Sequence, residues 1–351
     1  MVKRFKGLFI ISVILFSTAV GFAETKIWVG GDSSKPTDWD TPANWSPSGV
    51  PTSSDEVVIN SGGNQPVIEN QVTWSDKTVE IKKLEVKTGA TLKIIANERD
   101  LEFKGASDFL IQGQIILELK RGTTRYIKIS DTDFIGSSRI FIDGPSSGFN
   151  SDYHTNLEAS GNINFKPDSI ITAGTYANDD RLIINSPSVA IAGSCVVDSK
   201  LEIKNTYDST GLNIKIDGSL VANQDFTIPN STNTKIRSSG YVTLIQGISS
   251  LNNADWIASN GTITTKGHFR VPNFKQTYGS LNLAGGGTQN LNIEQAYNLK
   301  IESLSTTSLR VNIKILNSFD NKASGIGEGT AGKSYRLVRI SIEGTFIVKR
   351  I

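Results

Sequence analysis

The chain has 351 residues, with 36 Lys and Arg against 34 Asp and Glu, and it contains only 2 histidines and 1 cysteine. The balanced charge gives no sign of a nucleic-acid partner or of binding to an anionic membrane. Two histidines exclude a His-rich metal site, and a single cysteine excludes an intrachain disulfide. Burial and backbone hydrogen bonds must therefore hold the fold, and we expect Cys195 to be a core residue of a strand.

Residues 1–23 have the pattern of a secretory signal peptide, with a basic start, an apolar run over residues 7–16 and small residues up to Ala23. We expect cleavage after Ala23, which removes three of the 36 basic residues and leaves 33 against 34 acidic residues. No later stretch approaches the roughly 18 apolar residues of a membrane span. The sequence thus predicts an extracellular or cell-surface location, or the periplasm, with no membrane span in the mature chain.

Residues 24–78 are expected to form a cap over one end of the fold. Three of the 5 tryptophans, Trp28, Trp39 and Trp45, lie within 18 residues of one another here, and they can plug an open hydrophobic bore. The alternative is a carbohydrate-binding surface on which exposed indoles stack against sugar rings. Four acidic residues make Ca²⁺ the one cofactor to consider, although they lack the spacing of a known calcium loop: Asp32, Asp38, Asp40 and Asp55.

Residues 79–320 repeat a short glycine-led strand at intervals of 18 to 32 residues. The copies start at Gly89, Gly113, Gly136, Gly161, Gly193, Gly218, Gly240, Gly261 and Gly279. Most strands alternate apolar and polar residues, which is typical of half-buried strands. A β-sandwich needs longer strands and distant pairing, whereas this spacing fits one coil of three short strands. The sequence predicts an all-β, single-stranded parallel β-helix with coils about 4.8 Å apart.

Residues 321–351 follow the repeats. The stretch from Asn321 to Lys333 is rich in Gly, Ala and Ser and is typical of a linker. Two apolar segments come after it, with Glu343 and Gly344 between them. We expect these C-terminal strands to form a hairpin.

Two blocks of the sequence have a recognisable pattern: the first runs from Trp28-Val-Gly-Gly to Leu84-Glu-Val-Lys-Thr-Gly, and the second starts at Gly279-Ser-Leu-Asn-Leu. They resemble secreted bacterial surface proteins with a right-handed β-helix, of the autotransporter and filamentous-haemagglutinin type. The resemblance implies a right-handed solenoid and an exported, adhesin-like role. Only 32 residues follow Phe319, too few for the translocator barrel of autotransporters, so we expect a passenger without one.

Carboxylates are the best candidates for catalysis or ligand binding. Enzymes with a parallel β-helix, which this architecture resembles, act on polysaccharides through carboxylates and a basic residue, and two carboxylates about 5 to 9 Å apart can serve as acid and base. The same residues also suit turns, in which Asp bonds its own backbone. The candidates are Asp131 with Asp133, and Asp179 with Asp180 and Arg181.

The sequence favours a non-catalytic structural or adhesive rod. Its polar positions show turn chemistry repeated along the chain rather than one concentrated reactive set. The alternatives are a polysaccharide lyase or glycoside hydrolase on the same rod, and a carbohydrate-binding protein. The partner expected in each case is a polysaccharide or a ligand on a host or cell surface.

Overall fold

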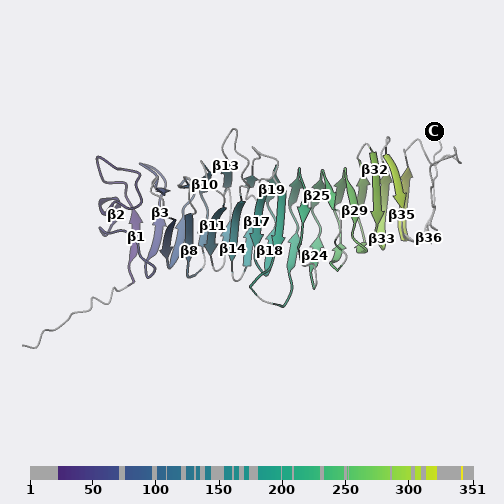
Figure 1. The fold of residues 1–351 in the computed structure, drawn as a ribbon, viewed down its shortest axis with the longest axis horizontal. Coiled ribbons are helices and arrows are strands. Elements are labelled where there is room, and N and C mark those ends of the chain that lie inside the picture. Colours follow the sequence, from purple (N-terminus) through teal and green to yellow (C-terminus); the bar gives the residue numbers. More distant parts are fainter. Residues whose placement is uncertain are drawn as a thin grey trace, which may run out of the picture.

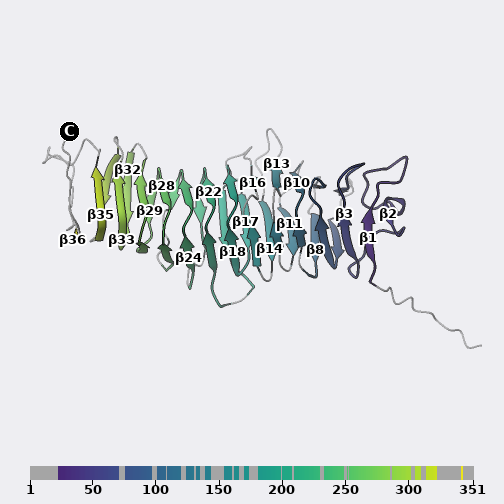
Figure 2. The same ribbon diagram turned by 180° about the vertical axis from the view of Figure 1, so that it is seen from behind.

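A computed structural model shows that the protein is a long parallel β-helix. Its strands are stacked side by side along one axis (Figures 1 and 2). The structure describes residues 23–70, 76–96, 101–107, 109–119, 124–129, 132–134, 139–143, 154–159, 162–165, 170–173, 181–198, 200–207, 209–229, 233–248, 251, 253–284, 287–301, 305–309, 314–321 and 341–342. Residues 1–22 of the expected signal peptide lie outside this part of the chain.

Three faces wrap the core, and each coil contributes one strand to each face in turn. Face 1 consists of β1 (Thr25–Trp28), β3 (Glu56–Ile59), β6 (Lys83–Val86), β9 (Phe109–Ile111), β12 (Thr132–Phe134), β15 (Asn162–Phe165), β18 (Ser188–Ile191), β21 (Asn213–Ile216), β24 (Lys235–Ser238), β27 (Asp255–Ala258) and β30 (Asn273–Gln276). All of these neighbours pair in parallel, which confirms the predicted fold class.

Face 2 follows face 1 in every coil. It consists of β4 (Val67–Glu69), β7 (Thr91–Ala96), β10 (Gln114–Leu119), β13 (Arg139–Asp143), β16 (Ile170–Ala173), β19 (Ser194–Val197), β22 (Ser219–Ala222), β25 (Tyr241–Leu244), β28 (Thr262–Thr265) and β31 (Ser280–Leu283). Near the C-terminal end, β33 (Gln295–Ile301) pairs with both β30 and β31, so faces 1 and 2 join into one 25-stranded sheet.

Face 3 is made of a 7-stranded and a 4-stranded sheet in succession. Its strands are β5 (Lys77–Ile81), β8 (Leu101–Gly105), β11 (Thr124–Ile129), β14 (His154–Ala159), β17 (Arg181–Asn185), β20 (Lys200–Lys204) and β23 (Phe226–Thr227), then β26 (Gly247–Ile248), β29 (His268–Arg270), β32 (Gly287–Asn292) and β34 (Ser305–Leu309). At the far end, β35 (Lys314–Asn321) pairs with β33 and with β36 (Ser341–Ile342). The rest of the expected C-terminal hairpin lies outside the described residues.

The predicted cap boundary at residue 78 needs a correction. Strands β3, β4 and β5 already pair with β6, β7 and β8 of the next coil, so the helix begins inside residues 24–78. Only the segment around the short 3-10 helix Pro42–Asn44 and β2 (Trp45–Ser46) departs from the coil path, with β2 antiparallel to β1. The first coil and the cap therefore overlap in sequence.

The glycine motif marks the corner where face 1 turns into face 2. A Cβ on Gly240 would lie 1.9 Å from the carbonyl oxygen of Gly218, and one on Gly261 would lie 2.0 Å from that of Gly240. Gly261 also has a φ of +81°, which favours glycine. The copy at Gly161 is out of phase, because Asn162 starts β15 on face 1. This explains the long interval of 32 residues between Gly161 and Gly193.

Apolar side chains from all three faces fill the bore as one continuous cluster. Cys195 belongs to it, fully buried in β19 as predicted. Trp256 packs against Phe269 and Phe274, with ring centroids 5.6 and 5.7 Å away. Among the described residues, no helix is long and apolar enough to cross a membrane.

Candidate functional site

The three N-terminal tryptophans close the end of the bore. Trp28, Trp39 and Trp45 are only 4%, 1% and 2% exposed, and Trp45 packs edge-on against both of the others with ring centroids 4.9 and 4.7 Å away. Trp39 continues this stack to Phe103 of β8, at 5.9 Å. The expected plug is thus confirmed. Buried indoles have no free face for a sugar ring, which removes the alternative of exposed stacking tryptophans.

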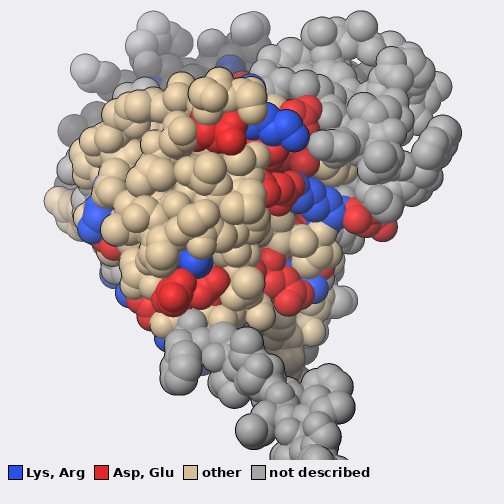
Figure 3. Space-filling model, turned by 90° about the vertical axis from the view of Figure 1, so that its left-hand side faces the viewer, with Lys and Arg blue, Asp and Glu red and all other residues tan. Residues whose placement is uncertain are grey.

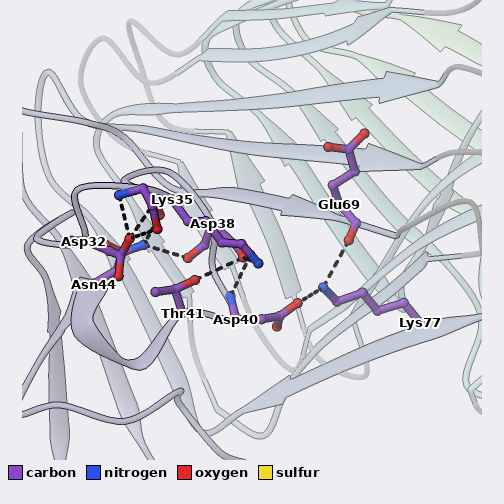
Figure 4. Close-up of polar contacts among 9 residues, drawn as sticks. Asp32, Lys35, Asp38, Asp40, Thr41, Asn44, Glu69 and Lys77 are labelled. Atoms are coloured by element: carbon purple, nitrogen blue, oxygen red, sulfur yellow. Dashed lines mark hydrogen bonds and ion pairs between the residues drawn. The ribbon is translucent and has the colours of Figure 1, made fainter.

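Asn44 holds the cap loop together from a fully buried position (Figure 4). Its side-chain amide donates to the carbonyl oxygens of Lys35 and Asp38, at 2.7 and 2.9 Å, and its Oδ1 accepts from the backbone N–H of Asp32 at 2.8 Å. Every polar atom of this amide is bonded, so it contributes strongly to the cap conformation.

The acidic residues of the cap are used in turns. The Asp32 carboxylate accepts hydrogen bonds from the Ser34 hydroxyl and from two backbone N–H groups, of Ser34 and Lys35, which lower its pKa. Asp38 accepts from the backbone N–H of Asp40 and from the Thr41 hydroxyl. These are the local bonds by which Asp stabilises turns.

Two ion pairs tie the cap down. Lys77 of β5 pairs with Asp40 and donates to the backbone carbonyl of Glu69 at 3.1 Å (Figure 4). On β1, Lys26 is 6% exposed and pairs with Glu24 at 2.9 Å. Figure 3 looks onto this end of the rod and shows a broad surface without charges, with acidic and basic groups side by side around it.

Asp55 fixes the start of β3 to the N-terminal segment. Its carboxylate accepts from the backbone N–H and hydroxyl of Thr52, both at 2.8 Å, and from the backbone N–H of Glu24 at 3.1 Å. Burial raises the pKa of this carboxyl, but the hydrogen bonds outweigh burial, and the net effect lowers its pKa. Asp55 therefore serves the fold of the cap.

The four aspartates proposed for Ca²⁺ do not form a cluster. Within the described part of the chain, no group of three or more His, Cys, Asp or Glu residues could hold a metal ion. Calcium binding at Asp32, Asp38, Asp40 and Asp55 stays a prediction from composition.

The predicted acidic pairs fall largely outside the described residues, which do not include Asp131, Asp179 or Asp180. Asp133 lies in β12 on face 1, opposite Leu110. Arg181 starts β17 on face 3, one coil further along. The backbone thus places Asp133 and Arg181 in strands on different faces of the rod.

A group of exposed aromatic residues was missed by the sequence reasoning. Tyr241 and Tyr278 are 65% and 57% exposed, and the rings of Tyr278 and Tyr297 lie 4.7 Å apart at 36°. All three occur at the corner between faces 1 and 2. Two of them stand next to the repeated glycines, in Gly240-Tyr241 and Tyr278-Gly279, and this was the signal that could have revealed them.

Comparison with known proteins adds one match. A family model described as a domain of unknown function (DUF8693) matches residues 27–139. No match was found among the curated proteins, and no solved structure matched either. The matched stretch runs from β1 to the first residue of β13, so this domain combines the cap with the first coils of the helix.

Proposed function

We propose that this chain is an exported, non-catalytic surface protein whose rod has a structural or adhesive role. The observation that carries the proposal is the continuous parallel ladder from β3 to β33, which sets outward side chains in straight rows along the rod. A surface of this kind favours many weak contacts with an extended partner. The overall affinity then exceeds that of any single contact, because the contacts are linked along one chain.

Ion pairs between neighbouring coils support a structural role. Lys82 contacts Glu56 at 3.1 Å across the corner, and Arg237 of β24 contacts Asp255 of β27 at 3.0 Å. Each such exposed pair contributes at most about 1 kcal/mol, but each also favours the observed register between coils. These charges therefore serve the rod itself.

Export can be tested by expressing the chain with its own N-terminus in a bacterial host. We expect a mature protein that begins at Glu24, found outside the cytoplasm and open to added protease on intact cells. A chain that keeps residues 1–23 and stays in the cytoplasm would contradict the export part of the proposal.

Catalysis can be tested on the same purified protein. Incubation with neutral and acidic polysaccharides should release neither reducing ends nor unsaturated sugar products. Beads coated with the protein should still adhere to cell-wall material. Release of such products, removed by Asp133→Asn or Arg181→Ala, would instead establish the alternative of a lyase or glycoside hydrolase.

A further inference from the structure

Three tyrosines occupy one edge of the rod, and we call Tyr241, Tyr278 and Tyr297 the tyrosine edge. Tyr241 and Tyr278 are the two most exposed of the large hydrophobic residues in the described part of the chain. Large apolar side chains are seldom left in water in a group unless they meet a ligand or partner. The pairing of Tyr278 with Tyr297 also stiffens the two rings against each other.

The strand register fixes the spacing of these rings. Tyr241 pairs with Thr262 in the next coil, and Thr262 pairs with Ser280 in the one after. Tyr278 precedes Ser280 by two residues, so it lies two coils from Tyr241, about 10 Å along the axis at a strand spacing near 4.8 Å. In the coil between them, the corner carries Asn260, Gly261 and Thr262, which have short side chains or none, so no other aromatic ring lies between the two tyrosines there.

Three strands of face 2 beside the tyrosine edge are neutral and polar on their outer side, and the charged Lys300 follows on β33, opposite Asn282. Strands β25, β28 and β31 present their alternate residues outward, and none of these residues carries a charge: Tyr241, Thr243, Thr262, Thr264, Ser280 and Asn282. All six are exposed or partly exposed. Hydroxyl and amide groups beside aromatic rings are the groups that orient a polar ligand by hydrogen bonding.

We propose that the tyrosine edge binds a neutral polysaccharide chain that lies along the rod axis. Sugar rings present C–H groups that pack on aromatic faces, and their hydroxyls bond to side chains such as Thr262 and Ser280. The rise of one coil is close to the length of one sugar unit in an extended glycan, so Tyr241 and Tyr278 suit alternate units. This inference gives the proposed adhesive function its ligand and rests on it.

The test is electrophoresis of the purified chain in native gels that contain mixed-linkage β-glucan, hydroxyethyl cellulose or galactomannan. We expect at least one of these neutral polymers to slow migration relative to a plain gel. The double variant Tyr241→Ala and Tyr278→Ala should lose the retardation, whereas Tyr241→Phe with Tyr278→Phe should keep it, because the rings remain. Tyr207→Ala, at an exposed tyrosine away from the edge, is the matched control and should behave as the unaltered chain.

Three results would overturn the inference: no retardation in any neutral gel, equal retardation of the double alanine variant, or retardation by polygalacturonate alone. If the double variant lacks a melting transition, Tyr241→Ala alone decides the question, since its ring is the most exposed. If the chain is exported and does not cleave polysaccharides, but no neutral gel retards it, only this inference is refuted. If the chain stays in the cytoplasm or cleaves the polymer, the proposed function is refuted instead.

Discussion

At the residue scale, the tightest constraint is the column of glycines at the corner between faces 1 and 2. Each of Gly218, Gly240, Gly261 and Gly279 approaches a glycine carbonyl of the preceding coil so closely that a Cβ would lie 1.9 to 2.1 Å from its oxygen. The contact involves backbone atoms on both sides, so no side chain can rotate away to make room. A methyl group here must push two coils apart.

We therefore predict that Gly261→Ala destabilises the protein markedly. The control is Gly62→Ala: Gly62 also has a positive φ, of +86°, but a Cβ there would meet nothing within 4 Å. Both variants incur backbone strain of about 1–2 kcal/mol, and the clash with the carbonyl oxygen of Gly240 should cost Gly261→Ala about 1–3 kcal/mol more. Urea denaturation followed by circular dichroism measures the difference. Equal stabilities would show that the corner can relax.

Cys195 gives a second prediction at this scale. It is fully buried, and burial raises the pKa of its thiol to about 12. Because a raised thiol pKa means that the reactive thiolate forms only at very alkaline pH, native protein should not react with Ellman's reagent at neutral or mildly alkaline pH. The same chain in denaturant should show one reactive thiol, matching its 1 cysteine. Rapid labelling of native protein would mean that face 2 opens at β19.

At the element scale, one buried amide connects several segments of the cap. Asn44 bonds Asp32, Lys35 and Asp38 at once, and its neighbour Trp45 donates from its indole to the carbonyl oxygen of Trp39 at 2.8 Å. These hydrogen bonds thus fix the cap loop and the tryptophan plug of the bore together. The stretch that matches the domain of unknown function contains both, along with the first coils beneath them.

We predict that Asn44→Ala loosens the cap by about 1–3 kcal/mol, because it leaves buried backbone groups without partners. The tryptophan fluorescence should shift toward the red as Trp39 and Trp45 meet water. Ser34→Ala is the matched control, since it removes one exposed bond to Asp32 and should change stability little. The account of the cap would be wrong if the two variants had the same fluorescence and melting temperature.

Elements were predictable from the sequence where a strand enters face 2 after glycine, since the corner there needs a residue without Cβ. The strands of face 3 were harder to predict from the sequence. The segment from Val79 to Val86 alternates apolar and polar residues except at Lys82 and Lys83, and the structure divides it there into β5 and β6. Two polar residues in a row mark this corner only weakly, because a β-bulge inside one strand breaks the alternation in the same way.

The candidate site was less predictable than the fold. Tryptophans near an end suit both a plug and a binding surface, and burial, which the sequence does not contain, separates the two. The exposed tyrosines were not noticed because Tyr241 and Tyr278 are 37 residues apart (278 − 241) and become neighbours along one edge only through the strand register. Register over several coils depends on every intervening corner.

At the scale of the whole molecule, each coil contacts mainly the coils before and after it. The three faces carry the same parallel pairing along the rod, and the apolar cluster is continuous through it. Stability is then approximately a sum of coil and interface contributions, as in other solenoids. Such a rod should tolerate the loss of one complete coil far better than the loss of part of one.

We predict that deleting residues 194–218 gives a folded, shorter rod. Ser194 pairs with Ser219 in register, so the deletion joins Gly193 to Ser219 and lets β22 take the place of β19. Apolar residues replace apolar residues inside, with Leu220 where Cys195 was and Ile236 where Ile214 was.

Small-angle X-ray scattering should show a maximum dimension about 5 Å smaller, with a cooperative melting transition retained. The matched control deletes residues 194–206, which removes β19 and β20 but keeps β21. Faces 2 and 3 then each lack a strand at the junction, and folding should fail because the inward side chains there lose their column. If both deletions fold or both fail, the coils do not act as exchangeable units, and the rod must instead depend on contacts specific to each coil.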